Sequence, residues 1–274
     1  MNFHSDKWIM DRVREHYNEA LEYFPEDRIV GIFYQGSGNY GLDVPNSDVD
    51  TKLIVTPTLD DIIFNRKPVS TTHIRANEEH IDFKDLRLML TTFRKQNLNF
   101  IEILFTKYKI INPLYEDLWN RLITENEMIA RYNPVAAVRT MKGIAMEKYH
   151  AMEHEYPSKV DVIAKYGYDP KQLHHLFRVE EYIERYINGV AYADCLISKN
   201  SECLKSVKNG CYTLGDARWM GKVAIDRITE MADKFRVDNI EKVNEEVDIL
   251  LDDVQKEIMR LAIQVEMKKE EINE

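Results

Sequence analysis

The sequence predicts an α+β protein in which a β-sheet with flanking helices precedes a helical C-terminal region. Two observations lead to this class. Up to about residue 112, short runs rich in β-branched and aromatic residues alternate with helical stretches. Beyond that point, nearly every segment has helical periodicity, and neither a repeat nor a low-complexity linker interrupts the sequence. We therefore expect two domains, residues 1–112 and 113–274.

The elements of the first region follow from local composition. Residues 28–34, RIVGIFY, are rich in β-branched and aromatic side chains and predict a buried strand. Residues 48–55, DVDTKLIV, predict a second strand. The other expected elements are helices over 6–23, 58–64 and 84–95, and two strands over 70–75 and 79–83.

Capping residues mark the helices of the second region. Asn133 and Asp169 each stand before a proline, which predicts helices over 134–154 and 170–188. Gly215-Asp216 opens another helix. The last helix carries apolar residues in steps of three and four, at positions 240, 243, 247, 250, 254, 258, 261 and 265. We expect this stripe to pack within the chain, with a homodimer seam through the C-terminal helix as the alternative.

Composition excludes several classes of protein. No apolar run approaches the roughly 18 to 20 residues that cross a bilayer, and the charged N-terminus is not a signal peptide. Three cysteines, Cys195, Cys203 and Cys211, are too few for a disulfide framework, so we expect a cytoplasmic protein with reduced thiols. The net charge of −10 argues against binding of extended duplexes, while a small or terminal RNA substrate stays open.

One segment, GSGNYGLDVPNSDVD from Gly36 to Asp50, carries candidate functional residues. It follows one expected strand and leads into the next. Its small residues at 36–38 allow backbone N–H groups to approach an anion such as phosphate. Asp48 and Asp50, two residues apart on a strand, are expected to share one face. Adjacent carboxylates repel each other unless a cation lies between them, and Mg²⁺ takes oxygen ligands of this kind.

A third carboxylate, Asp82, lies between two apolar residues in the later strand. Three converging acids can hold two Mg²⁺ ions about 4 Å apart and clamp an in-line displacement, and Mn²⁺ can substitute. One carboxylate can also accept the proton of the attacking hydroxyl. Glu78, Glu79 and Asp85 are nearby alternatives for the third position.

The second proline-capped helix has a polar face. At 100° per residue, Lys171, His175, Arg178 and Tyr182 fall within about 60° of arc. This face is either solvated or a cationic stripe that contacts the triphosphate or a substrate phosphate. His174 lies off the stripe and is expected to be structural.

Five further polar residues have two interpretations each. Glu102, in the apolar run FIEILF, either supports the site or is a structural acid. Arg66 and Lys67 either touch an acceptor or belong to a surface loop. Arg139 and Lys142 either face a cleft or lie on a solvated helix face.

The order of a Gly-Ser turn, Asp-x-Asp and a later acid resembles the signature of the DNA polymerase β nucleotidyltransferase superfamily. QGSGNYGLDVPNSDVD more closely resembles the YcgL-like branch of nucleotidyltransferases from bacteria and phages. The stretches NLNFIEILF at 97–105 and YDPKQLHHLFR at 168–178 resemble two further segments of that branch. The resemblance covers roughly residues 28–190 and implies a nucleotidyltransferase-type mixed sheet.

The resemblance also implies site roles. Asp48, Asp50 and Asp82 are expected to bind Mg²⁺ at a two-metal site and to be the catalytic residues. Nucleotide binding is assigned to a larger set: Gly36, Ser37, Tyr40, Ser47, Lys171, His175 and Arg178.

The implied reaction moves a nucleoside monophosphate from an NTP to an acceptor hydroxyl or phosphate, with release of pyrophosphate. The acceptor is an RNA end, a small molecule or a protein side chain. Two other functions stay open: a nucleotide-binding regulatory or antitoxin-like module without turnover, and synthesis of an oligonucleotide or cyclic nucleotide.

Overall fold

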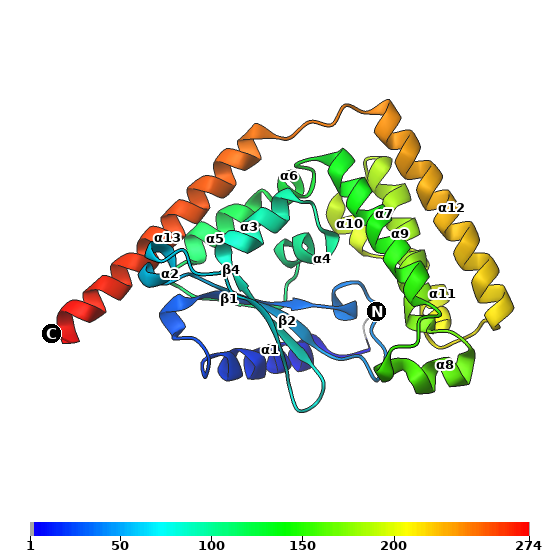
Figure 1. Ribbon diagram of the computed structural model, residues 1–274, viewed down its shortest axis with the longest axis horizontal. Helices are drawn as coiled ribbons and strands as arrows, with labels where there is room; N and C mark the ends of the chain where they lie inside the picture. The colour runs from blue at the N-terminus through cyan, green and yellow to red at the C-terminus, as the bar shows by residue number, and fades with distance from the viewer. Residues whose placement is uncertain (1–2, 274) are drawn as a thin grey trace. The chain divides into compact units, whose positions relative to one another are not determined.

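The computed structural model describes residues 3–273, and its contacts divide the chain into two units (Figure 1). The sheet unit comprises the chain up to Asn39, Asp43–Tyr132 and the segment from Val243 onward. The helical unit comprises Tyr40–Leu42 and Asn133–Lys242. This division differs from the expected boundary at residue 112, because the two helices that follow the sheet and the last helix of the chain all belong to the sheet unit.

The described part of the sheet unit contains a five-stranded mixed sheet, in the order β3-β4-β2-β1-β5. β2 and β4 are parallel, and the other neighbouring strands are antiparallel. A mixed sheet combined with many helices agrees with the expected α+β class. The strands are β1 (Ile29–Gln35), β2 (Asp50–Val55), β3 (Ser70–Ile74), β4 (His80–Asp85) and β5 (Lys109–Ile111).

Helix α1 (Asp6–Ala20) covers one face of this sheet (Figure 1). Its buried side chains Ile9, Val13 and Ala20 join a core that contains alternate residues of the strands. The strand residues of this core are Ile29, Ile32, Tyr34, Leu53, Val55, Ile81 and Phe83. Because side chains alternate along a strand, the even-numbered residues of β2 and β4 point to the opposite face.

The other face is covered by helices that come later in the chain (Figure 1). The ring of Trp119 packs 4.9 Å from that of Phe33, measured between centroids. The helices on this side are α3 (Leu86–Arg94), α4 (Leu98–Ile101), α5 (Glu116–Thr124) and α13 (Glu245–Asn273). The remaining short elements of the unit are η1 (Glu26–Arg28), η2 (Ser37–Asn39), α2 (Leu59–Ile63), η3 (Glu102–Leu104) and α6 (Asn126–Ala130).

The apolar stripe of α13 is covered within the chain, as expected, although of the eight expected positions only 247, 254 and 258 are fully buried. Val247, Leu251, Val254 and Ile258 are fully buried against the sheet unit, where α13 contacts α3 and α5. The buried positions follow a heptad spacing from Val247, whereas Ile240 precedes the helix and is 92% exposed.

In the helical unit, three long helices pack against one another: α7 (Pro134–Ala151), α9 (Pro170–Ile187) and α12 (Leu214–Asp238). The expected caps of α7 and α9 are confirmed, since the side chains of Asn133 and Asp169 each accept a backbone N–H of the first turn. The shorter elements are η4 (Pro157–Lys159), α8 (Val160–Tyr166), α10 (Tyr192–Leu196) and α11 (Ser201–Lys208). Within residues 3–273, no helix combines the length and the apolar character that a bilayer crossing requires.

Candidate active site

The Gly36-Ser37 turn emerges next to Asp50. β1 ends at Gln35, whose Cα partner across the antiparallel pair is Asp50, so the turn begins directly beside the first residue of β2. The Ser37 hydroxyl donates to Oγ of Ser47 at 3.3 Å. Sheet pairing and this hydrogen bond therefore bring four of the expected site residues into one neighbourhood.

The glycines of this turn have a packing reason of their own. Gly36 has φ +146°, and a Cβ added there would lie 3.0 Å from Oη of Tyr34. A Cβ on Gly38 would lie 2.9 Å from the same oxygen, which accepts the backbone N–H of Gly38 at 2.9 Å. The buried ring of Tyr34 thus occupies the space that side chains at 36 and 38 would need. Room for an approaching phosphate is not required to explain these glycines.

The strand expected from residue 48 begins two residues later, so the prediction for Asp48 was wrong in one respect. Asp48 is exposed and precedes β2. The next residue, Val49, donates its backbone N–H to Oε1 of Glu79 at 3.2 Å. Because Asp50 is already paired with Gln35, the last residue of β1, the pairing does not extend back to Asp48. The period-two rule therefore does not place Asp48 on the face of Asp50.

Asp50 is fixed by the start of β4. Its Oδ1 accepts the backbone N–H of His80 at 3.0 Å and lies 3.1 Å from Nδ1 of the same histidine. These contacts orient the carboxylate along the edge where β2 and β4 begin.

Asp82 lies on the same sheet face as Asp50, on the neighbouring strand β4 and two residues farther along the sheet. The parallel register pairs Lys52 with Asp82, two residues after Asp50. Oδ2 of Asp82 accepts a hydrogen bond from Nζ of Lys52 at 3.0 Å, and Oδ1 accepts one from the Thr72 hydroxyl at 2.6 Å. Burial opposes ionisation of Asp82, but Lys52 and Thr72 together lower its pKa, so the carboxylate is charged at neutral pH.

Lys52 is the site residue that sequence reasoning missed. Its side chain is 2% exposed, and its ammonium lies 4.1 Å from the centroid of the Phe100 ring. Burial lowers the pKa of Lys52, and the charge of Asp82 opposes that effect. The alternation that groups residues two apart on one face was a signal that could have placed Lys52 on the face of Asp50.

The other acids near Asp82 have different roles. Glu79 is buried and bonded to two arginines and a histidine. Asp85 caps α3 through its side chain, and Glu78 adopts φ +67° in the turn between β3 and β4. Of the four candidate acids, Asp82 is the one that the strand register places on the face of Asp50.

The carboxylates of Asp48, Asp50 and Asp82 have the donor chemistry that Mg²⁺ prefers. In the part of the chain that the structure describes, however, no group of three or more His, Cys, Asp or Glu side chains is arranged to hold a metal ion. Asp82 is bound to Lys52, and Asp48 lies before the strand. A cation bound by Asp82 would lie next to the ammonium of Lys52.

Four of the expected nucleotide-binding residues belong to the helical unit. Two of them contact each other, since Cζ of Arg178 lies 3.5 Å from the centroid of the Tyr40 ring. Lys171 is exposed at the start of α9. Burial, followed by the charges of His174 and Arg178, holds the pKa of His175 well below its usual value. His175 is therefore neutral at pH 7 and adds no positive charge to the expected stripe.

Tyr182 does not belong to that polar face. It is 1% exposed and packs edge-on against Tyr192, so its assignment to the stripe was wrong. The whole side chain of Tyr182, including its hydroxyl, is buried in the core of the helical unit. Helical spacing alone does not reveal this burial. His174 is structural, as expected, because its Nδ1 donates to the backbone carbonyl of Leu204 at 2.8 Å.

Of the remaining polar candidates, Arg139 and Lys142 form ion pairs. Nζ of Lys142 bonds Asp233 at 3.0 Å, and Arg139 pairs with Glu241 at 3.0 Å, both within the helical unit. Arg66 and Lys67 are exposed, and Glu102 is buried.

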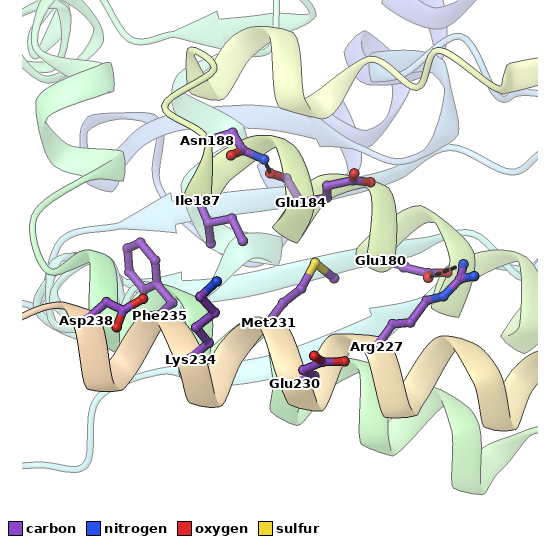
Figure 2. Close-up of a pocket in the computed structure, with 10 residues that line it drawn as sticks. All are labelled: Glu180, Glu184, Ile187, Asn188, Arg227, Glu230, Met231, Lys234, Phe235 and Asp238. Carbon is purple, nitrogen blue, oxygen red and sulfur yellow. Dashed lines mark hydrogen bonds and ion pairs between the residues drawn. The ribbon is translucent and has the colours of Figure 1, made fainter.

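A cavity of about 550 Å³ lies between α9 and α12 in the helical unit (Figure 2). Met231 and Phe235 form part of its apolar lining, and Arg227 lies 3.5 Å from Glu180 at one end. Four of the lining residues are acidic and two are basic. This excess of negative charge disfavours a triphosphate, and none of the expected nucleotide-binding residues lines the cavity.

A scan against protein-family models finds no match for this chain, and a search of curated proteins finds none either.

Proposed function

We propose that this protein is a Mg²⁺-dependent nucleotidyltransferase of the DNA polymerase β type, which moves a nucleoside monophosphate from an NTP to an acceptor. The main support is one observation: Asp82 and Asp50 share a sheet face on adjacent parallel strands, and the Gly36-Ser37 turn begins beside Asp50. The resemblance of the Gly36–Asp50 segment to that superfamily supports the same function.

In the proposed reaction, an oxygen of the acceptor forms a bond to the α-phosphorus of the NTP. The bond from that phosphorus to the bridging oxygen of the β-phosphate breaks, and pyrophosphate leaves with the electron pair. The proton of an acceptor hydroxyl passes to a carboxylate of the site or to solvent. Such a reaction needs positioning and neutralisation of charge more than covalent chemistry.

Asp48, Asp50 and Asp82 are the residues that would hold the metal. Bound Mg²⁺ would neutralise the phosphate oxygens and orient the attacking group. The lowered pKa of Asp82 suits an ionised ligand and makes this carboxylate a weak base. Backbone N–H groups of the turn at Gly36 and Ser37 would bind phosphate oxygens beside Asp50.

The test is to incubate the protein with Mg²⁺, NTPs labelled at the α-phosphate and a total cell extract, and to identify products by mass spectrometry. We expect transfer of label with release of pyrophosphate. An arm with the four NTPs alone detects synthesis of an oligonucleotide or cyclic nucleotide, which needs no foreign acceptor.

Asp50→Asn is the decisive variant, and we expect it to reduce transfer by at least about a hundredfold. Asp253→Asn is its matched control, because this exposed carboxylate on α13 lies 4.0 Å from its nearest ion-pair partner and is remote in sequence from the site. Circular dichroism and thermal unfolding verify that both variants are folded. Equal activity of Asp50→Asn and the wild type would overturn the proposal, as would an inactive wild type across all NTPs and acceptors.

One observation favours a second candidate, a nucleotide-binding regulatory module without turnover. The ammonium of Lys52 already neutralises Asp82, as a cation would. Calorimetry distinguishes the two functions, because tight binding of an NTP with no product formed would favour the regulatory module.

A further inference from the structure

Glu79 is a buried carboxylate at the turn into β4, and it contacts the residue between Asp48 and Asp50. Its Oε1 accepts the backbone N–H of Val49 at 3.2 Å. Its other contacts come from Arg12, Arg75 and His16. Burial opposes the ionisation of Glu79, but hydrogen bonds from His16, Arg12 and Asn77 hold its pKa far below the ordinary value. The peptide of Val49 is therefore bound by a fixed negative charge.

His16 extends this network to the other side of Asp50. It lies on α1, is fully buried, and places Nε2 2.9 Å from Oε2 of Glu79. A carboxylate can only accept, so Nε2 carries the hydrogen. Nδ1 of the same ring lies 2.9 Å from Oγ1 of Thr51. The ring thus joins Glu79 to the residue that directly follows Asp50.

Both neighbours of Asp50 are held on the α1 face, Val49 through its backbone N–H and Thr51 through its side-chain hydroxyl, while the carboxylate of Asp50 is held on the opposite face. That carboxylate accepts the N–H of His80, the residue next to Glu79. Two consecutive residues at the entry to β4 therefore fix the position of Asp50. Glu79 binds the backbone N–H of the preceding residue, Val49, and His80 donates its own backbone N–H to the carboxylate of Asp50.

We infer that Glu79 and His16 are positioning residues, which set the place of Asp50, and of Asp48 before it, for cation binding. This inference rests on the proposed function. Groups that orient metal ligands typically change metal affinity by about 10- to 100-fold when they are replaced. Neither residue lies on the sheet face of Asp50, so both act through Val49 and Thr51 and not by contact with substrate.

The chain contains a matched control for a purely structural role. Glu19 lies on α1, as His16 does. Like Glu79, it bonds a histidine and an arginine, which are His73 and Arg75, at 2.6 Å each. Its hydrogen bonds go to the β3 side of the sheet and reach none of residues 48–51. Arg75 bonds both Glu19 and Glu79, so Glu19→Gln and Glu79→Gln remove the same charge from one connected network. Of the two carboxylates, Glu79 is the one whose hydrogen bonds reach the Asp48–Thr51 segment.

The experiment measures the affinity of the full-length protein for Mn²⁺ by electron paramagnetic resonance, well below the unfolding temperature. We expect Glu79→Gln to weaken Mn²⁺ binding by about tenfold. Glu19→Gln should lower the unfolding temperature yet change Mn²⁺ affinity less than about twofold. Amide hydrogen exchange of Val49 should accelerate in Glu79→Gln and not in Glu19→Gln. If Glu79→Gln does not fold, Thr51→Val, which removes the partner of His16, should weaken Mn²⁺ binding by about threefold.

The outcomes separate the two proposals. Unchanged Mn²⁺ affinity in the folded Glu79→Gln variant overturns the positioning role and leaves the proposed function intact. An equal loss of affinity in Glu19→Gln also overturns it, because the effect would then follow stability. A wild type that neither binds Mn²⁺ nor turns over any NTP overturns both.

Discussion

The ammonium of Lys52 lies 3.0 Å from Oδ2 of Asp82, across two parallel strands, and is almost completely buried. A buried cation persists only where a partner compensates for lost hydration, and Asp82 provides that compensation. In the proposed reaction the same carboxylate is a ligand of Mg²⁺. Lys52 would then compete with the metal for Asp82, and its charge lowers the pKa of this carboxylate.

Lys52→Met tests this competition. We expect Mn²⁺ to bind at least about tenfold more tightly, because a positive charge next to the metal site is removed. The free energy of unfolding should fall by about 1–3 kcal/mol, since Asp82 keeps Thr72 but loses its charged partner. Calorimetric titration with Mn²⁺ and urea denaturation measure the two effects.

Lys84→Met is the control for this substitution. Lys84 lies on the same face of the sheet, but its ammonium donates to the hydroxyl of Ser70 at 2.8 Å and not to Asp82. We expect a change in Mn²⁺ affinity of less than about threefold, because the charge lies farther from the site. Similar effects of the two substitutions would contradict a specific competition by Lys52.

The stability of the helical unit should depend on the protonation of His174. Burial lowers the pKa of this histidine to about 4 from an ordinary 6.5, and Arg178, Lys208 and Lys171 add to the effect. Between these values the unfolded chain binds more protons than the folded chain. Stability is therefore complete above pH 6.5 and is lost as the pH falls toward 4, by at most about 1.4 kcal/mol per pH unit.

His174→Asn keeps an amide donor near the position of Nδ1 and removes this titration. We expect the variant to be less stable than the wild type at pH 7 and the difference to shrink as the pH falls from 6.5 to 4. Urea denaturation at several pH values measures the difference, and NMR titration reports the histidine directly. A difference that stays constant over this range would rule out the expected linkage.

Gly38→Ala tests the packing explanation for the glycine-rich turn. The new methyl group would meet Oη of Tyr34 at 2.9 Å, so we expect a loss of about 1–3 kcal/mol in the free energy of unfolding. Tyr34→Phe removes that oxygen. We expect it to lower the free energy of unfolding less in the Gly38→Ala variant than in the wild type, and a double-mutant cycle measures this difference. Gly143→Ala is the control, because nothing lies within 4 Å of its added Cβ and a helical alanine stabilises by about 0.5–1 kcal/mol.

Local sequence signals predicted the strands that carry the site, and residues 70–75 pair with 79–83 as the sequence suggested, but the pairing of β2 with β4 was not predicted. Strand composition and turn residues located β1, β2 and β4 to within two residues at most of their ends. The parallel register of β2 and β4 depends on tertiary packing, and it brings Lys52 opposite Asp82. Residues two apart were expected to share a face, but that rule holds only inside a strand, and Asp48 lies outside it.

The network behind Asp50 could not be predicted from sequence spacing. Glu79 is separated from His16 by 63 residues and from Val49 by 30, so no local pattern joins them. Glu79 was a candidate ligand because it is an acid near Asp82. Glu79 precedes β4, and its bonds to Arg12 and His16 of α1 place its carboxylate on the α1 face, where arginines and a histidine satisfy its charge. Contacts between residues far apart in the sequence, and not a local pattern, therefore separate Glu79 from Asp82.

Leu251→Ala tests whether α13 is an integral part of the sheet unit. The side chain of Leu251 is fully buried in the described chain, so we expect a loss of about 2–5 kcal/mol in the free energy of unfolding. Ile249→Ala is the control on the same helix, because Ile249 is 64% exposed and should change stability by less than about 0.5 kcal/mol. Urea denaturation at two protein concentrations completes the test. A stripe that packs within one chain gives the same midpoint at both concentrations, whereas a seam between two copies would raise the midpoint at the higher one.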